Sequence, residues 1–153
     1  MDRLLSVVVS VYNEEKALEE FYRETTNVLE QISWDYELLF VNDGSRDGSQ
    51  DILDRLAASD SRVRVISFSR NFGHEAAMIA GLDYSRGDGI ICMDADLQHP
   101  PECIPDILAK FEEGYQVINM VRTRNRTAGL VKNITSSGFY WLINRISDVH
   151  FEA

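Results

Sequence analysis

The sequence predicts an α/β protein with a Rossmann-like, open and mainly parallel sheet flanked by helices. Two observations lead to this prediction. Short apolar runs rich in valine and isoleucine alternate with segments whose apolar residues recur at helical spacing. Turn-forming residues such as glycine, asparagine and aspartate separate many of these runs. Strands that alternate with helices in this way usually form a parallel sheet with helices on both faces.

The first half of the chain contains two strand–helix units. Residues 4–11 form a continuous apolar run, which is typical of a parallel strand covered on both faces. Asn13 can cap the following helix, whose apolar positions recur up to Ile32. Residues 36–41 read as a second strand, and apolar residues within 52–56 mark a short second helix.

The second half continues the alternation of strands and helices. A proline suits the first turn of one predicted helix, and a glycine suits its end. The predicted strands span residues 63–68, 89–93 and 116–121, and the predicted helices span residues 74–84, 105–114 and 134–146.

Size and composition indicate one ordinary soluble domain over residues 1–153. The chain is 44% hydrophobic and 26% charged, and its net charge of −10 disfavours binding to nucleic acid. No apolar run approaches the roughly 18 residues needed to cross a bilayer. Cys92 and Cys103 lack metal-binding or redox spacing, so we expect two buried free thiols in a reducing compartment.

Polar side chains follow the predicted strands, where a ligand site is expected. In open α/β sheets, ligands bind beyond the carboxyl ends of the strands. The polar residues at these positions are Tyr12, Asn13, Glu14, Asn42, Asp43, Asp94, Asp96, Gln98 and Arg122. Several carboxylates should therefore lie together on one edge of the sheet.

Asp94 and Asp96 end an apolar strand that we expect to be central and buried. Carboxylates held together in a partly dry site need compensation, and a divalent cation is the ordinary means. Either a turn brings both carboxylates to one ion, or one binds metal while the other accepts a hydrogen bond from a hydroxyl or water. Gln98 can add a neutral oxygen, and so few protein ligands suit a magnesium ion that arrives with a diphosphate.

Two other classes of site fit the sequence poorly. A dinucleotide-binding turn needs glycine directly after the first strand, and residues 11–14 contain none. Phosphoryl transfer would need a nucleophilic aspartate or a glycine loop that cradles phosphate, and neither stands out.

Four motifs occur in order along the chain. They are Val-Tyr-Asn-Glu-Glu at 11–15, Val-Asn-Asp-Gly-Ser at 41–45, Ser-Arg-Asn-Phe-Gly-His at 69–74 and Asp-Ala-Asp-Leu-Gln-His-Pro-Pro-Glu at 94–102. These motifs resemble those of the family 2 glycosyltransferases, which have the GT-A fold. Within that family the chain is most similar to the polyprenyl-phosphate branch, which contains dolichyl-phosphate mannose synthases and bactoprenol glucosyltransferases. The likeness covers essentially the whole chain.

The resemblance implies a nucleotide-sugar site. Tyr12, Glu14 and Asp43 would hold the base and ribose, and the Asp43 carboxylate could accept the imino N–H of uracil. We also assign Asn13 and Arg70 to this site.

The resemblance further implies metal and phosphate ligands. Asp94 and Asp96 would form the Asp-x-Asp pair, with Asp94 contacting the nucleotide sugar as well. Asp96 and Gln98 are the better candidates for direct contact with Mg²⁺ or Mn²⁺. Arg122 matches an arginine that faces phosphate in this branch, and Lys132 lies where a second basic residue is expected, so both should bind the acceptor phosphate. Asp94, Asp96 and Arg122 form the expected catalytic set.

The expected function is the inverting transfer of a hexose from a nucleotide diphosphate sugar to a polyprenyl phosphate, for cell-envelope glycan or glycolipid modification. A UDP-sugar such as UDP-glucose is favoured over GDP-mannose. The enzyme would act in the cytoplasm at the inner face of the membrane, and its oligomeric state is left open. Two alternatives remain, which are transfer to a saccharide hydroxyl by the same fold and nucleotide-sugar binding without catalysis.

The chain also departs from the family pattern. The family often has proline where Ser10 stands. It continues beyond the position of Ala153 into an acceptor segment and, in membrane-bound members, transmembrane helices, so we expect a truncated chain. His74 and His99 lie within the motifs, and each could be catalytic or structural.

Overall fold

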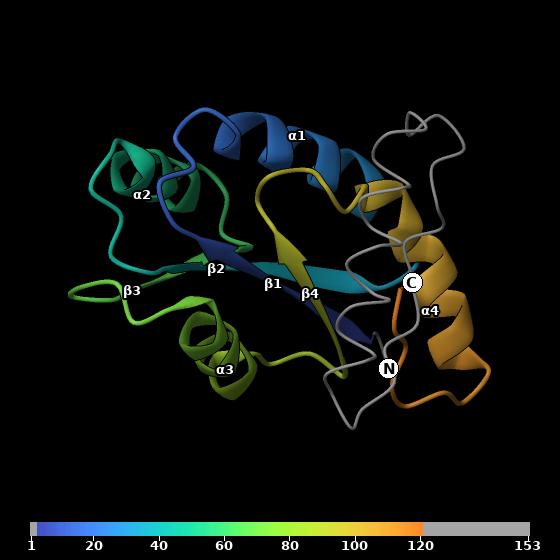
Figure 1. The fold of residues 1–153 in the computed structure, drawn as a ribbon. Coiled ribbons are helices and arrows are strands. Elements are labelled where there is room, and N and C mark those ends of the chain that lie inside the picture. Colours follow the sequence, from blue (N-terminus) through green and yellow to red (C-terminus); the bar gives the residue numbers. More distant parts are fainter. Residues whose placement is uncertain (1–2, 121–153) are drawn as a thin grey trace, which may run out of the picture. The chain divides into compact units, whose positions relative to one another are not determined.

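The computed structural model describes residues 3–120, which contain a four-stranded parallel sheet (Figure 1). The strands are β1 (Leu4–Val11), β2 (Asp35–Asn42), β3 (Val63–Ser67) and β4 (Gly89–Asp94), in the spatial order β3-β2-β1-β4. The chain divides into two compact units, Met1–Ile118 and Asn119–Ala153, and the second lies almost wholly outside the described residues. A single domain over the whole chain stays a prediction.

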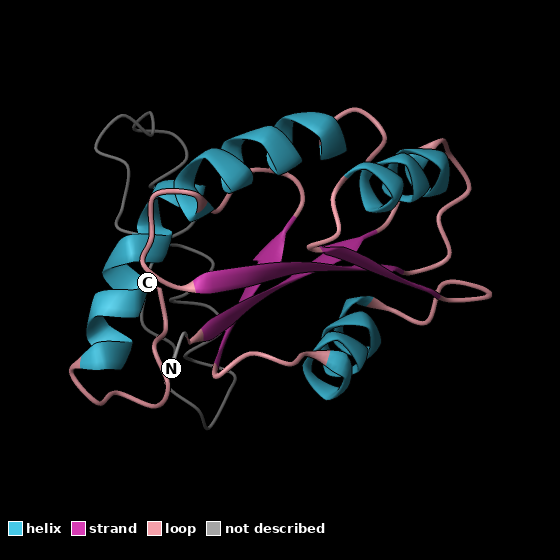
Figure 2. Ribbon diagram, turned by 180° about the vertical axis from the view of Figure 1, so that it is seen from behind, coloured by secondary structure: helices cyan, strands magenta, loops and turns pink. Residues whose placement is uncertain are grey.

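Helices cover both faces of the sheet, as the alternating pattern predicts. α1 and α2 lie on one face and α3 lies on the other (Figures 1 and 2). The helices are α1 (Leu18–Leu29), α2 (Ser49–Ser59), α3 (His74–Tyr84) and α4 (Ile104–Glu112), with a 3₁₀ turn at Pro101–Cys103 before α4. Within residues 3–120, no helix has the length and apolar character needed to cross a membrane.

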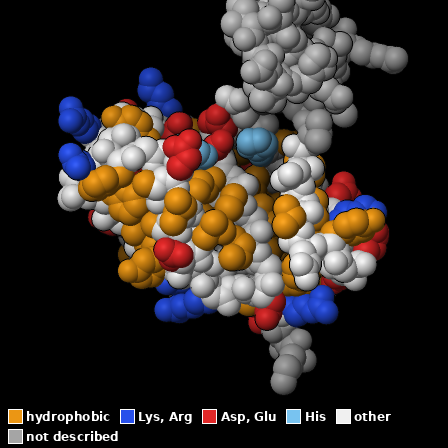
Figure 3. Space-filling model, turned by 60° about the horizontal axis from the view of Figure 1, so that its bottom comes forward, with side chains coloured by type: hydrophobic (Ala, Val, Ile, Leu, Met, Phe, Trp, Pro, Cys, Tyr) orange, Lys and Arg blue, Asp and Glu red, His pale blue; other side chains and the backbone are white. Residues whose placement is uncertain are grey.

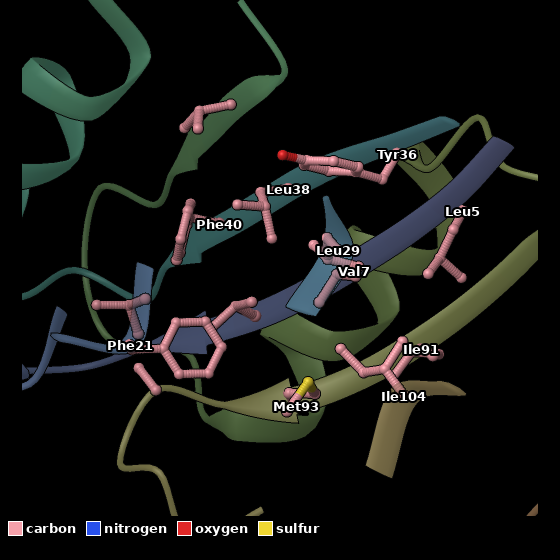
Figure 4. Close-up of a cluster of buried hydrophobic side chains, with 14 of the residues drawn as sticks. Leu5, Val7, Phe21, Leu29, Tyr36, Leu38, Phe40, Ile91, Met93 and Ile104 are labelled. Atoms are coloured by element: carbon pink, nitrogen blue, oxygen red, sulfur yellow. The ribbon is translucent and has the colours of Figure 1, made fainter. Parts of the chain in front are cut away.

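The main core lies between the sheet and α1 (Figure 4). β1 contributes Leu5 and Val7, β2 contributes Leu38 and Phe40, and all four side chains are fully buried. The ring of Phe21 from α1 meets Phe40 edge to face, with 6.2 Å between the ring centroids. Burial of each such side chain stabilises the fold by about 1.5–3 kcal/mol, which holds α1 on the sheet.

The other face of β1 holds α3 at close range. A Cβ atom at Gly81 of α3 would lie 2.1 Å from Cγ1 of Val8, so no larger residue fits there without movement. α3 begins at His74, about two helical turns before Gly81. The close contact therefore brings the start of α3 to the carboxyl edge of the sheet.

A buried carboxylate lies toward the opposite edge of the sheet. Glu37 of β2 is 6% exposed, and it accepts hydrogen bonds from the Ser6 hydroxyl at 2.6 Å and the Arg64 guanidinium at 2.8 Å. The backbone N–H of Arg86 donates to it at 2.8 Å. Burial alone would raise the pKa of Glu37, but these hydrogen bonds outweigh it and lower the pKa below 4.5. The ionised group ties the loop before β4 to the sheet.

The helix after β1 begins later than the sequence predicts. Asn13 is not its N-cap, because a φ of 58° places Asn13 in the left-handed region, inside a loop. The N–H groups of Ala17 and Leu18 donate to the Glu14 carbonyl oxygen at 3.0 and 3.1 Å, and α1 starts at Leu18. Local turn formation overrides the capping preference of asparagine here.

Within residues 3–120, β4 lies at an edge of the sheet with one exposed face, so the prediction of a strand buried on both faces is wrong, while its central position stays a prediction. Ile90 is 41% exposed and Cys92 is also exposed, because α3 packs on β1 and β2. Cys103 is only partly buried, so the expected pair of buried thiols is also wrong. No strand forms over residues 116–120, against the predicted fifth strand, and the helix predicted at 134–146 lies outside the described residues.

Replacing Gly81 with alanine tests the close approach of α3. The added methyl group meets the stiff side chain of Val8, so we expect the free energy of unfolding to fall by about 1–2 kcal/mol despite the better helix propensity of alanine. Urea unfolding of Gly81→Ala, Val8→Ala and the double variant measures the effect. The double variant should lose less free energy of unfolding than the sum of the two single losses, because Val8→Ala removes the methyl groups that the new side chain would meet. Wild-type stability in Gly81→Ala would contradict the contact.

Replacing Glu37 with glutamine tests the buried carboxylate. Because the pKa of Glu37 is lowered by folding, its ionised form stabilises the fold above pH 4.5, and this contribution is lost as the pH falls through the lower folded value. Glu37→Gln should lower the free energy of unfolding by about 1–3 kcal/mol near neutral pH and by less below about pH 4. Urea unfolding at both pH values, with the exposed Glu20→Gln as control, measures this. An equal loss of unfolding free energy at both pH values would contradict a stabilising role for the ionised carboxylate.

Candidate functional site

The carboxyl ends of β1, β2 and β4 form the edge of the sheet that carries the candidate site. A hollow of about 130 Å³ opens there, lined by Ser10, Val11, Tyr12, Asp43, Asn71 and His74. Tyr12 is 45% exposed, so its ring is available to a ligand. Figure 3 shows histidine side chains beside a group of acidic side chains at one edge of the face that carries α3.

Asp43 is 3% exposed and organises the loop after β3. Its two carboxylate oxygens accept the N–H groups of Phe72 at 2.7 Å and Gly73 at 2.9 Å. Gly44 has a φ of 66°, and a Cβ atom there would lie 2.3 Å from the carbonyl carbon of Arg70. The loop is therefore held tightly against the end of β2. Each Asp43 oxygen keeps lone-pair capacity that a ligand N–H could use.

Asn13 and Glu14 fasten the loop after β1 to the loop after β2. The Asn13 N–H donates to Ser45 Oγ at 3.0 Å, and Asn13 Oδ1 accepts the Arg46 N–H at 2.8 Å. The Glu14 N–H donates to Ser49 Oγ at 2.9 Å. The Asn13 side-chain oxygen thus already has a protein partner, and its contact with a nucleotide sugar stays a prediction.

The carboxyl group of Glu14 lies close enough to other acidic groups to respond to their charge. Burial raises the pKa of Glu14 above 4.5, and the charges of Asp96, Asp47 and Asp94 raise it further. Carboxylates from the ends of β1 and β4 therefore crowd one edge of the sheet. A divalent cation bound among them would relieve the repulsion.

Asp94 lies at the end of β4, where side chains from other segments reach it. Ser10 Oγ is 3.1 Å from Asp94 Oδ1, and His74 Nδ1 is 3.5 Å from the same oxygen. His99 Nδ1 is 3.9 Å from Asp94 Oδ2. Both carboxylate oxygens thus have an imidazole nearby, while the side chain remains 39% exposed and open to a ligand.

Asp96 and Gln98 lie in the turn after β4. Asp96 is exposed, and its Oδ1 accepts the Gln98 N–H at 2.9 Å. Among residues 3–120, no group of three or more His, Cys, Asp and Glu side chains is arranged to hold a metal ion. Carboxylate and amide oxygens suit Mg²⁺ or Mn²⁺, and magnesium commonly completes its shell with water and substrate phosphates. Asp94, Asp96 and Gln98 offer oxygen atoms of this kind, and their role as metal ligands stays a prediction.

Of the three basic residues predicted to belong to the site, the structure describes only Arg70. Arg70 is exposed in the loop after β3, with its guanidinium 4.7 Å from the centroid of the Phe72 ring. Arg122 and Lys132 lie outside the described residues, and their contacts with an acceptor phosphate stay predictions.

A larger hollow, of about 370 Å³, lies at the other end of the sheet, where β2 begins. Among its lining residues, Arg62 lies over the ring of Tyr36 at 4.5 Å and pairs with Asp60 at 2.9 Å. The charge of Arg62 is thus already compensated. The smaller hollow is the better candidate site, because it lies at the carboxyl ends of the strands.

Comparison of the sequence with models of known protein families identifies the family of this chain. The model described as glycosyl transferase family 2 matches residues 6–149. The chain belongs to glycosyltransferase family 2. The resemblance carried by the four motifs is thereby confirmed, and the family 2 match includes all of β2, β3 and β4 and most of β1.

Curated family 2 relatives match nearly the whole chain. The chain is 46% identical to the uncharacterized glycosyltransferase YkcC of Bacillus subtilis (strain 168) over 94% of its length. It is 43% identical to a prophage bactoprenol glucosyl transferase homolog of Escherichia coli (strain K12) over 97% of its length. These matches cover 45% and 48% of the relatives, so the chain spans about half the length of the curated proteins it matches.

Solved glycosyltransferase structures share the fold. The chain resembles S. aureus TarS 1-349 with a TM-score of 0.58 and 21% identity, over 82% of this chain and 39% of that one. It resembles the mannosyltransferase PcManGT from Pyrobaculum calidifontis, solved in complex with GDP-Man and Mn²⁺, with a TM-score of 0.54 and 24% identity, over 63% of this chain and 28% of that one. The predicted GT-A fold is confirmed.

Two residues of the candidate site have no assigned role in the sequence prediction. Ser10 stands out in the sequence only as a departure from proline, yet its hydroxyl contacts Asp94. Asn71 lies within the third motif and lines the hollow. The pairing of Ser10 with Asp94 depends on strand register, which the sequence alone does not specify.

Replacing Asp43 with asparagine tests how Asp43 organises the loop. The amide NH₂ would face one of the two N–H donors, so one hydrogen bond is lost. We expect the free energy of unfolding to fall by about 1–3 kcal/mol, and the N–H of Phe72 or Gly73 to exchange faster with solvent. Urea unfolding and hydrogen exchange measure these effects, with the exposed Asp51→Asn as control. Unchanged exchange at both N–H groups would argue against the role.

Proposed function

We propose that the chain carries the donor site of an enzyme that transfers a hexose, with inversion, from a UDP-sugar to a polyprenyl phosphate. The observation that carries the proposal is that Ser10 and His74 both line the hollow and approach Asp94. The hollow and the carboxylate edge therefore adjoin. The names of relatives support the substrates, since bactoprenol glucosyl transferases of Shigella phages SfV and SfII are 41% identical to the chain.

The hollow would receive the base of the donor. Tyr12 offers an exposed ring for stacking, and Asp43 offers carboxylate oxygens to the imino N–H of uracil. Asn13, Glu14 and Arg70 would complete the contacts to ribose and diphosphate. A carboxylate acceptor at this position favours a UDP-sugar, with UDP-glucose as the expected donor.

Asp94, Asp96 and Gln98 would hold Mg²⁺ or Mn²⁺ beside the diphosphate. When bound, such a cation stabilises the charge that develops on the departing nucleoside diphosphate, typically by several kcal/mol. The acceptor oxygen attacks the anomeric carbon in a single displacement, which inverts that carbon. Electrostatic stabilisation of the leaving group is the main contribution expected from the protein.

The acceptor would need little help from a general base, because a phosphate oxygen is already anionic near neutral pH. Arg122 and Lys132 would hold the acceptor phosphate through charge-assisted hydrogen bonds. A polyprenyl carrier resides in a membrane, so we place the reaction at the cytoplasmic face of the membrane. The net charge of −10 agrees with a small-molecule donor rather than a nucleic acid partner.

Asp96→Asn tests the cation site. Asparagine keeps an oxygen for the Gln98 N–H but loses the charge, so the Mn²⁺-dependent part of the UDP-glucose affinity should fall at least about tenfold. Calorimetric titration of UDP-glucose with and without Mn²⁺ measures this, with Asp83→Asn on the exposed side of α3 as the matched control. Unaltered Mn²⁺-dependent affinity in Asp96→Asn would refute the site.

GDP-mannose should bind to the wild-type chain more weakly than UDP-glucose does, and equal affinity for the two donors would refute the preference for uracil.

A further inference from the structure

Side chains from three separate elements meet at Asp94. Ser10 comes from β1, His74 begins α3 and Asp94 ends β4. The Ser10 hydroxyl lies 3.1 Å from Asp94 Oδ1 and 2.9 Å from His74 Nδ1. The transfer proposed above assigns no role to Ser10 or His74.

The arrangement of the backbone brings Ser10, His74 and Asp94 together. Ser10 and Asp94 are paired in the parallel ladder, so their side chains leave the same face of the sheet. α3 packs on that face, where Gly81 allows the helix to lie against Val8. His74 is thereby held over the serine hydroxyl. Regular elements, rather than loops, set the positions of all three polar groups.

The hydrogens can be assigned by counting donors. An ionised aspartate only accepts hydrogen bonds, and a serine hydroxyl has one hydrogen to donate. The Ser10 hydrogen therefore belongs to Asp94 Oδ1, since two acceptors would otherwise face each other at 3.1 Å. His74 must then donate from Nδ1 to the serine oxygen. A neutral His74 consequently carries its proton on Nδ1 and leaves Nε2 unprotonated.

We propose that Ser10 and His74 are positioning residues that hold the Asp94 carboxylate in the orientation that binds the activated sugar. The proposal rests on the proposed function, which assigns Asp94 to the donor site. The two hydrogen bonds in series limit rotation of the carboxylate and offset the repulsion among Asp94, Asp96 and Glu14. A carboxylate that is already oriented loses less conformational freedom when the ligand binds.

The serine hydroxyl is the necessary link in this series. His74 Nδ1 lies 3.5 Å from Asp94 Oδ1, which is too long for a good hydrogen bond. Without the hydroxyl, the imidazole does not engage the carboxylate directly.

The first test is spectroscopic and needs no ligand. Nitrogen NMR of the imidazole rings at about pH 8.5, well above the reference histidine pKa, reports which nitrogen of His74 carries the proton. His74→Asn identifies the resonances by their loss. We expect protonation at Nδ1. Protonation at Nε2 overturns the proposal, because Ser10 would then have to donate to His74 rather than to Asp94.

The second test is the affinity for UDP-glucose in the presence of Mn²⁺. Ser10→Ala should weaken binding about tenfold, whereas Ser10→Thr keeps the hydroxyl and should restore most of the affinity. His74→Asn, which keeps a donor near the position of Nδ1, should bind better than His74→Ala. Ser67→Ala is the matched control, because it removes a strand-end hydroxyl that donates to Gln50 at 2.7 Å, and it should bind like wild type.

An Asp94→Asn background shows whether Ser10 acts through Asp94. In that background Ser10→Ala should cause no further loss, because the carboxylate it positions is gone. A wild-type affinity in folded Ser10→Ala overturns the positioning role, and so does an undiminished loss in the Asp94→Asn background. A wild-type chain that binds no UDP-glucose overturns the proposed function itself, and the positioning role falls with it.

Discussion

The parallel pairing of β1 with both β2 and β4 is the constraint on which the candidate site depends. Val11 pairs with Asn42 on one side, and Ser10 pairs with Asp94 on the other. All three strands therefore end at one edge, which gathers polar groups from distant parts of the sequence. A slip of one residue would turn the Asp94 side chain to the opposite face of the sheet, away from Ser10.

This edge concentrates negative charge that the protein compensates only in part. The raised pKa of Glu14 results from burial and from the nearby charges of Asp96, Asp47 and Asp94. Asp94 has a serine hydroxyl and an imidazole beside it, whereas Asp96 is exposed in its turn. The two carboxylates of the Asp-x-Asp motif thus have different surroundings, which agrees with the separate roles in donor orientation and in cation binding that we propose for them.

Much of the fold follows from the sequence because strand and helix periodicity are local signals. All four strands of the described sheet and the helix at 74–84 match their predicted spans to within one residue at each end. The errors come from non-local effects. The exposure of Cys92 depends on which strand lies at the edge, and the delayed start of α1 depends on the turn around Asn13. The site motifs identify Asp43 and Asp94, but the contacts of Ser10 appear only once the strands are paired.

The carboxylate of Asp43 also changes the electrostatics at the start of α3. The amino end of a helix carries roughly half a positive elementary charge, which in many proteins attracts phosphate groups. Here the N–H groups of Phe72 and Gly73, directly before α3, are already bound by an aspartate. The negative charge of that aspartate opposes the positive end of the α3 dipole at this point. The diphosphate of a donor bound as proposed above would therefore take its counter-charges from a metal ion and from arginine or lysine side chains instead.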